Sequence, residues 1–318
     1  MYTIGIDLGG TNIAAAIVSK EGEILIKESV PTHRERSDEE IIKAMAELSI
    51  HLIEKAKIEQ SQIHSIGIGS PGMVDSEKGI LIYANNLNFK NSSVAKVFQS
   101  YFNIPVYLEN DANAAAFGEY ESGAGKKYRD MVAVTLGTGV GGGIILDGRI
   151  ISGSFGGGGE IGHAVILADG DDCSCGRKGC WESYSSATGL IKHAKQMALK
   201  HPESLLNKLV KGDLEKMNAK IPFDAAQKGD AWAGKLIDEY IKYLAVGLTN
   251  VIHFLQPQVI VLGGGVSKQG DNLVIPLKKK IEKEIYGGKE FFKTEIKIAE
   301  LGNEAGIIGA AMLYKLHE

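Results

Sequence analysis

The fold is decided by residues 2–12, which read YTIGIDLGGTN. Residues 2–7 alternate as a β-strand, the glycine-rich residues 8–12 turn the chain, and residues 13–18 resume as a second strand. A hairpin signal, Lys-Glu-Gly-Glu at 20–23, follows directly. The sequence therefore predicts that the chain begins with a β-hairpin whose first turn is rich in glycine.

A very similar unit begins 128 positions later, where residues 132–137 read VAVTLG. The residues that line up are Ile4, Ile6, Leu8, Gly9 and Ile17 with Val132, Val134, Leu136, Gly137 and Ile145. Two glycine-rich hairpins can also match by chance over about twenty residues. We favour duplication of one structural unit.

Strands alternate with helices along the rest of the chain. Ser37 and Glu40 form a capping box, which predicts a helix that ends near Lys57. Further strands are predicted at 63–68, 105–108 and 259–262, and further helices at 112–121, 230–255 and 305–316. This alternation indicates an α/β sheet that binds ligands beyond its strand ends.

A domain junction is expected near residues 117–125, with the last helix returning to the first domain. The prediction is a small α/β domain at 1–118, joined by residues 304–318, and a larger α/β domain at 119–303 that carries the cysteines.

The composition bounds the class of protein. The 318 residues are 44% hydrophobic, enough for two ordinary cores, and their net charge of −4 offers no general attraction to nucleic acid. Residues 1–7 lack the features of a signal peptide, and no apolar run is long enough to span a membrane, so we expect a cytoplasmic protein with no membrane partner. All three cysteines lie between positions 173 and 180, which excludes an extended disulfide framework.

Both glycine-rich turns carry a hydroxyl, Thr11 in the first and Thr138 in the second. Glycine lets several backbone N–H groups converge on one phosphate, although a lone glycine-rich hairpin is more often only a tight turn. The apparent duplication favours phosphate binding by both. The candidate residues are Gly9, Gly10, Thr11 and Asn12 in the first turn and Gly137, Thr138, Gly139 and Gly141 in the second.

Asp7 ends the first strand, where a carboxylate beside triphosphate oxygens requires Mg²⁺ between them. The alternative is a turn-forming aspartate. A third glycine loop, with Gly264 and Gly265, follows the strand at 259–262 and suits the flat face of a base or ribose. Alternatively, that loop is only the turn that starts a helix, and the sequence favours neither interpretation.

Residues 109–113, Glu-Asn-Asp-Ala-Asn, stand where an apolar strand gives way to a helix. In one interpretation, Asp111 accepts the proton of an attacking hydroxyl while Asn110 hydrogen-bonds a neighbouring hydroxyl. In the other, Asp111 or Asn110 only caps the helix. The residues alone leave both open.

Three thiols lie within residues 173–180, CSCGRKGC, and a histidine stands ten residues upstream. Three Cys and one His make a closed tetrahedral zinc site, and a disulfide between two of the thiols is the alternative. Closing the cluster brings Glu160 and Glu182 near one place, where carboxylates can accept hydrogen bonds from sugar hydroxyls, although solvated glutamates are common. The predicted zinc ligands are His163, Cys173, Cys175 and Cys180.

Together these motifs resemble the ROK family of bacterial repressors, uncharacterised open reading frames and sugar kinases. The matching stretches are DLGGTN at 7–12, ENDAN at 109–113, LGTGVGGG at 136–143, GEIGH at 159–163 and CSCGRKGCWE at 173–182. They span nearly the whole chain, and the last two in combination are highly specific. The resemblance implies an α/β fold of the actin-like ATPase (hexokinase and Hsp70) type, with two RNase-H-like domains and a ligand cleft between them.

The resemblance also implies ATP-dependent phosphorylation of a hexose at its 6-hydroxyl, with Mg²⁺ as cofactor and glucose as the first candidate. Asp111 would be the general base. His163 would hold zinc with one ring nitrogen and face a sugar hydroxyl with the other. The implied sugar contacts are Gly72, Asn85, Asn86, Asn110, Asp111, Glu160, His163 and Glu182.

Two alternatives remain for the function. The three-cysteine arrangement is similar to the glucokinase and N-acetylmannosamine kinase branches of the family, so N-acetylmannosamine or another hexose is the second candidate substrate. A non-catalytic sugar-sensing module related to ROK repressors is the alternative from a different class, and the intact Asp111 argues against it. By the same resemblance we expect a homodimer or homotetramer without a nucleic-acid partner.

Overall fold

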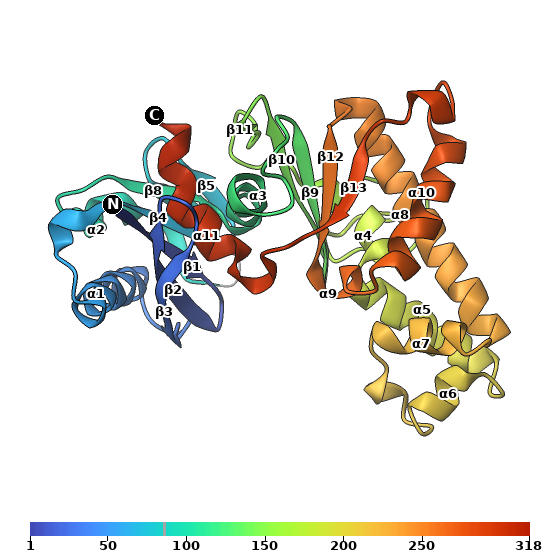
Figure 1. Ribbon diagram of the computed structural model, residues 1–318. Helices are drawn as coiled ribbons and strands as arrows, with labels where there is room; N and C mark the ends of the chain where they lie inside the picture. The colour runs from blue at the N-terminus through green and yellow to red at the C-terminus, as the bar shows by residue number, and fades with distance from the viewer. Residues whose placement is uncertain (85–86) are drawn as a thin grey trace. The chain divides into compact units, whose positions relative to one another are not determined.

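The computed structural model describes residues 1–84 and 87–318. The chain forms two compact units, the first made of residues 1–132, 143–159 and 300–318 and the second of residues 133–142 and 160–299 (Figure 1). These units are defined by contacts within the chain, and a compact unit is not necessarily a domain that folds independently. The predicted domain boundaries at 118 and 303 therefore stay a prediction.

The first sheet contains the predicted hairpin. Its strands are β1 (Tyr2–Leu8), β2 (Asn12–Ser19), β3 (Ile24–Pro31), β4 (Ile63–Ser70) and β8 (Val106–Asn110), in the order β3-β2-β1-β4-β8. β1 and β2 pair antiparallel with Ile4 opposite Ile17, whereas β4 is parallel to both β1 and β8. The carboxyl ends of β1, β4 and β8 therefore lie at one edge of the sheet.

Helix α1 (Asp38–Ala56) begins at the predicted capping box. Ser37 accepts a hydrogen bond from the N–H of Glu40, the Glu40 carboxylate accepts one from the N–H of Ser37, and Lys57 ends the helix in a left-handed conformation. The apolar face of α1 packs on β2 and β3 and shares a hydrophobic core with Ile4 and Ile6. The capping box thus placed this helix correctly.

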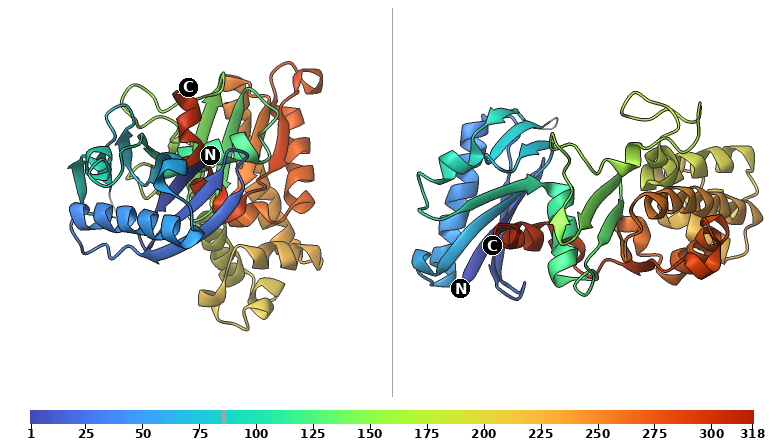
Figure 2. Two further views of the ribbon diagram at one scale, coloured as in Figure 1. Left: turned by 60° about the vertical axis from the view of Figure 1, so that its left-hand side comes forward. Right: turned by 90° about the horizontal axis from the view of Figure 1, so that it is seen from above.

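The other face of the first sheet is covered by α11 (Ala305–Met312), which continues as a 3-10 turn (Leu313–Leu316) (Figure 2). Gly5 and Gly67 let α11 approach the strands closely. A Cβ atom on Gly5 would lie 2.0 Å from the carbonyl oxygen of Ile307, and one on Gly67 would lie 1.7 Å from that of Ala310. Helix α3 (Asp111–Ser122) packs against α11 in turn.

A small antiparallel sheet, which the sequence analysis did not anticipate, also belongs to the first unit. Its strands are β5 (Met73–Asp75), β6 (Ile80–Ala84) and β7 (Phe89–Ser92), followed by the short helix α2 (Val94–Phe98). These strands are three to five residues long and contain Lys90 and Asn91, so their apolar alternation is weak.

The second sheet repeats the strand order of the first. Its strands are β9 (Met131–Leu136), β10 (Val140–Leu146), β11 (Arg149–Ile150), β12 (Val259–Gly263) and β13 (Glu295–Ile298), in the order β11-β10-β9-β12-β13. Asp147 and Gly148, both at positive φ, form the tight turn between β10 and β11. This shared order confirms the duplication that the two glycine-rich hairpins predicted.

The long helix α8 (Ala231–Leu255) begins at Asp230, whose side chain accepts a hydrogen bond from the N–H of Ala233. Against it pack α4 (Trp181–Ser185), α5 (Ala187–Lys200), α7 (Lys220–Gln227) and α10 (Asp271–Glu284), while α6 (Leu205–Leu209) packs on α5 and α7. Among the described residues, no helix combines the length and the apolar character needed to cross a bilayer.

Candidate functional site

The edge of the first sheet gathers two aspartates. Asp7 lies at the end of β1, opposite Gly69 of β4, and Gly69 lies opposite Glu109 of β8. Asp111 follows two residues later as the first residue of α3. Parallel pairing therefore brings Asp7 and Asp111, 104 positions apart in the sequence, to the same edge of one unit.

Both carboxylates are partly withdrawn from water, and burial raises the pKa of each above its ordinary value. The charge of Asp111 raises the pKa of Asp7 further, while Lys27 lowers it. Hydrogen bonding opposes the shift at Asp111, whose carboxylate accepts a hydrogen bond from the N–H of Ala112 at 2.8 Å. A partly buried carboxylate of this kind is a stronger base than one in water.

Asn110 is the N-cap of α3, one of the two roles that the sequence left open. Its side-chain oxygen accepts hydrogen bonds from the N–H groups of Ala112 (2.9 Å) and Asn113 (3.2 Å). Its side-chain nitrogen donates to the carbonyl oxygen of Gly72 at 3.1 Å. Because that bond uses one of the two amide N–H groups, the second can still serve a ligand hydroxyl.

Gly72 is held in the left-handed region at φ 94°, and a Cβ atom there would lie 2.1 Å from the carbonyl oxygen of Tyr83. No other residue type fits this position without moving β6. The predicted sugar contacts Asn85 and Asn86 lie outside the described residues.

The first glycine turn is fastened to the end of β3. The N–H of Gly9 donates to the carbonyl oxygen of Asn12 (3.0 Å), the Thr32 hydroxyl donates to that of Gly9 (2.7 Å), and the Thr32 N–H donates to that of Thr11 (2.8 Å). Thr32 itself is fully buried. The turn is therefore rigid while Thr11 and Asn12 remain exposed to a ligand.

The second glycine turn is fixed by Glu182 of α4. One carboxylate oxygen of Glu182 accepts a hydrogen bond from the N–H of Val140 at 3.0 Å, and a Cβ atom on Gly139 would lie 2.2 Å from the same oxygen. A cavity of about 340 Å³ opens beside this turn, lined by Thr138, Gly139, Asp172, Ser174, Glu182, Ser183, Ser186, Thr188, Gly189 and Lys192. Hydroxyls and a lysine on a glycine turn are suited to phosphate.

The third glycine loop starts the short helix α9 (Gly264–Ser267), so the helix start is present. A helix start does not exclude contact with a base or ribose, which stays a prediction for this loop. Gly264 has φ 82°, and a Cβ atom there would lie 2.5 Å from the carbonyl oxygen of Leu136, directly before the second glycine turn. Gly265 has open space around the position of a Cβ atom.

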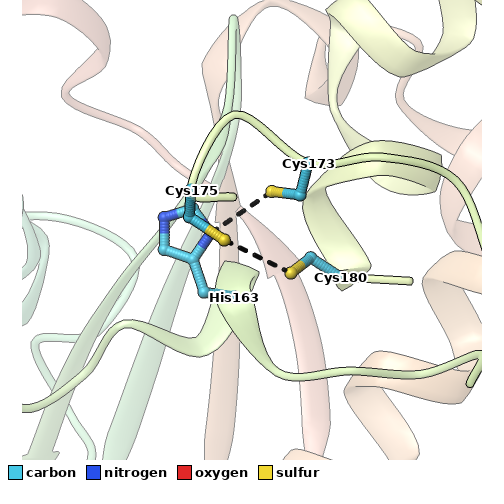
Figure 3. Close-up of side chains that lie close together, drawn as sticks. All are labelled: His163, Cys173, Cys175 and Cys180. Atoms are coloured by element: carbon cyan, nitrogen blue, oxygen red, sulfur yellow. Dashed lines mark hydrogen bonds between the residues drawn. The ribbon is translucent and has the colours of Figure 1, made fainter. Parts of the chain in front are cut away.

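The four predicted zinc ligands come together in the second unit (Figure 3). Cys173 Sγ lies 3.7 Å from His163 Nδ1, Cys175 Sγ lies 3.7 Å from Cys180 Sγ, and all four ligand atoms lie within 4.8 Å of one another. A tetrahedral zinc ion with Zn–S bonds of about 2.3 Å separates two sulfurs by about 3.8 Å. The donor set and its spacing therefore fit zinc, whereas a disulfide requires about 2.05 Å between sulfurs.

The thiols cannot all ionise beside one another without a cation. Burial first, and then the neighbouring thiols Cys173 and Cys175, raise the pKa of Cys180. Burial also acts to raise the pKa of Cys173, but hydrogen bonds from Cys175 and His163 outweigh it and lower that pKa to about 6. This cluster is adapted to a cation that stabilises every thiolate.

Glu182 also reaches this cluster from the other side. Its second carboxylate oxygen accepts a hydrogen bond from the Ser174 hydroxyl at 3.2 Å and lies 3.9 Å from Cys173 Sγ. Glu160 is exposed and directly precedes the 3-10 turn Ile161–His163, where its carbonyl oxygen accepts a hydrogen bond from the N–H of His163. Glu182 thus joins the thiol loop to the second glycine turn, a contact that the sequence did not predict.

Two buried glutamates of the first unit were also missed. Glu109 and Glu119 are only 6% and 3% exposed, and each carboxylate accepts three hydrogen bonds. The partners of Glu119 include the N–H groups of Glu300 and Leu301. A charged residue directly after the apolar part of β8 was the available signal for Glu109, while two of the three partners of Glu119, Glu300 and Leu301, lie far away in the sequence.

Comparison with known proteins agrees with this geometry. The family model described as "ROK family" matches residues 3–317. The glucokinase of Streptomyces coelicolor is 37% identical over 313 residues, covering 98% of this chain and 96% of that protein, and the glucokinase of Thermotoga maritima is 38% identical over 314 residues with the same coverage.

Among solved structures, a ROK family glucokinase from Streptomyces griseus in complex with glucose and AMPPNP superposes with a TM-score of 0.78. It is 36% identical and matches 98% of this chain and 99% of its own. The predicted actin-like ATPase fold is confirmed by this likeness and by the two sheets of equal strand order. A match of this extent in both sequence and structure establishes that the chain belongs to the ROK family.

Proposed function

We propose that the protein is a glucokinase, which transfers the γ-phosphoryl group of ATP to the 6-hydroxyl of glucose and releases ADP. The observation that carries the proposal is the partly buried Asp111 at the N-terminus of α3, beside Asp7 and the Asn110 cap. The glucokinases of similar sequence support the choice of glucose.

Asp111 acts as the general base in this proposal. Its carboxylate takes the proton of the 6-hydroxyl as the oxygen attacks the γ-phosphorus, and the bond to the β,γ-bridging oxygen breaks. The raised pKa of Asp111 suits this task. The free N–H of Asn110 and the backbone at Gly72 border the sugar.

Asp7 would hold Mg²⁺, directly or through water. The fit rests on two carboxylates at one sheet edge whose pKa values are both raised, because a cation there relieves their repulsion. When bound, Mg²⁺ neutralises charge on the phosphate oxygens. Asn12 and Thr11 in the first turn, and Thr138 in the second, contribute hydroxyl or amide contacts to the phosphates, and the loop at Gly264 and Gly265 borders the adenosine.

The cluster of His163, Cys173, Cys175 and Cys180 would hold a structural zinc ion. Because Nδ1 of His163 faces the thiols, its Nε2 is free to meet a sugar hydroxyl. Glu160 and Glu182 are the further sugar contacts in this proposal. A dimeric or tetrameric state stays a prediction, as does a cytoplasmic location.

The deciding experiment measures ADP release with a panel of hexoses, namely glucose, mannose, fructose and N-acetylmannosamine, in the presence of ATP and Mg²⁺. We expect the highest kcat/KM with glucose. A higher value with N-acetylmannosamine would change the substrate but keep the class. Tight glucose binding without turnover of any sugar would defeat the kinase proposal in favour of a sugar-sensing module.

A further inference from the structure

The carboxylate of Glu109 lies at the centre of a hydrogen-bond network around the Asp111 turn. One of its oxygens accepts hydrogen bonds from the N–H of Asn110 (2.8 Å) and from the side-chain nitrogen of Asn113 (3.0 Å). The other oxygen accepts one from the Ser76 hydroxyl (3.1 Å). Glu109 is 6% exposed, and a carboxylate so buried is tolerated only when its oxygens are satisfied.

Two of the three partners flank the proposed base in the sequence. Asn110 directly precedes Asp111, and Asn113 lies in the same first turn of α3. A shift of Glu109 therefore disturbs the backbone N–H directly before Asp111 and the side chain of Asn113 after it.

The same network holds the strand that follows Gly72. Ser76 comes directly after β5 and donates to Glu109, while Asn110 donates to the carbonyl oxygen of Gly72. Two hydrogen bonds thus tie residues 72–76 to the turn that carries Asp111. These two bonds therefore help to hold residues 72–76, the proposed border of the sugar site, against the turn that carries the proposed base.

We infer that Glu109 is a positioning residue, which fixes the Asp111 turn against residues 72–76 so that the base meets the acceptor hydroxyl. The inference rests on the proposed kinase function. Glu109 itself contacts no substrate in this account. A misplacement of reacting groups by about 1 Å can cost 100-fold in rate, so a residue of this kind affects kcat although it does no chemistry.

The test uses Glu109→Gln and Glu109→Leu in the full-length protein. Gln keeps an oxygen for Asn110 and Asn113 and can donate to the Ser76 oxygen, so we expect kcat within about threefold of the unaltered protein. Leu has a similar volume but accepts nothing, and we expect kcat to fall about 10- to 100-fold and the KM for the sugar to rise, with the KM for ATP unchanged.

Leu52→Ala is the matched control for stability. Leu52 is fully buried in α1 and belongs to the hydrophobic core of the same unit, away from the Asp111 turn. Its truncation should lower the melting temperature at least as much as Glu109→Leu while leaving kcat within about twofold at a temperature where the protein is folded. This contrast separates positioning from general destabilisation.

A folded Glu109→Leu variant with unchanged kcat and sugar KM would overturn the inference, and so would a Gln variant as impaired as the Leu variant. If Glu109→Leu does not fold, Asn113→Ala decides in its place. That change removes one partner, and we expect a fall in kcat of about fivefold with the KM for ATP unchanged. An unaltered kcat in Asn113→Ala would then refute the role.

Calorimetric titration with glucose distinguishes failure of the positioning role from failure of the proposed kinase function. Failure of the unaltered protein to phosphorylate any hexose would defeat the function. Weaker glucose binding by Glu109→Leu than by Leu52→Ala would still support positioning of residues 72–76 and Asn110. Equal glucose affinity in both variants, with equal kcat, would refute it.

Discussion

The two sheets share one strand order but differ at the end of their first strand. In the aligned hairpins, Asp7 of β1 corresponds to Thr135 of β9, and each is followed by Leu-Gly and a threonine-containing turn. The carboxylate of Asp7 has a pKa raised by burial and by Asp111, while Thr135 carries no charge. The same strand order therefore presents a carboxylate at the edge of the first copy, where we propose cation binding, and an uncharged threonine at the edge of the second.

The copies also differ in the segment after their third strand. β3 leads directly to α1, whereas β11 is followed by about eighty residues, including the thiol cluster and four helices, before α8 begins. The insertion reaches back to the hairpin of its own copy, because Glu182 bonds Val140. The duplicated scaffold thus carries the Cys/His cluster, our proposed zinc site, in one copy and Asp111, the proposed base, in the other.

The largest effect is expected when the base is removed. Asp111→Asn should lower kcat by about 100- to 10,000-fold while glucose affinity changes only a few-fold, because the amide keeps the shape of the carboxylate but cannot take a proton. ADP release and calorimetric titration with glucose would measure the two quantities. Turnover near that of the unaltered protein would remove Asp111 from the mechanism.

Giving the first copy the residue of the second tests the comparison directly. Asp7→Thr should lower kcat/KM for ATP by about 100-fold and raise the Mg²⁺ concentration needed for half-maximal rate, since a cation ligand is lost. Thr135→Val, a change of similar size in the second hairpin, should leave the Mg²⁺ requirement unaltered. If both variants change the Mg²⁺ requirement equally, the proposed difference between Asp7 and Thr135 is wrong.

Loss of zinc should affect the sugar more than the nucleotide. Cys175→Ser removes one of four ligands, and we expect glucose affinity to fall about 10- to 100-fold with a smaller change for ATP. Elemental analysis of the purified protein measures the zinc. Lys178→Ala, on the same loop but with its ammonium group paired with Asp172 at the surface, should keep the metal. Purified protein free of zinc that still binds glucose tightly would contradict the structural role.

The smallest effect concerns stability. Because the pKa of Asp111 is raised in the folded protein, its protonated form contributes stability that is present below pH 3.8 and lost as the pH rises through the raised pKa. At pH 7 the buried charge therefore costs stability, and Asp111→Asn should raise the melting temperature by about 2 °C, a gain that shrinks towards pH 4. Calorimetric melting at both pH values measures it, and an equal shift at each would show that burial of the charge is not the cause.

Local signals predicted much of this fold. The capping box at Ser37 and Glu40 marked α1 to within a residue, and the spacing of glycines and apolar residues identified two related hairpins. The proximity of the four proposed metal ligands could be predicted from the sequence because CxCxxxxC lies in one loop, to which His163 is added from outside. Signals of this kind lie within a few residues of one another.

Contacts made across long stretches of sequence could not be read in this way. Glu119 accepts hydrogen bonds from the backbone N–H groups of Ala124, Glu300 and Leu301. The sequence at 300–301 carries no signal that these two N–H groups bond to a side chain about 180 residues away. Likewise, Glu182 was expected to contact the sugar, and its bond to Val140, which depends on how α4 meets the second hairpin, was not predicted.

The close packing of α11 on the first sheet affects the order in which parts of the protein can fold during synthesis. The last helix packs on β1, β4 and α3, and a Cβ atom on Gly309 would lie 1.7 Å from the carbonyl oxygen of Ala114, so its place is specified by backbone surfaces that form early. A chain emerging from the ribosome has β1 and β4 long before residues 305–312 exist. The face of the first sheet that carries Gly5 and Gly67 therefore stays uncovered until residues 305–312 have been made, and the proposed base lacks the packing of α11 behind α3 until then.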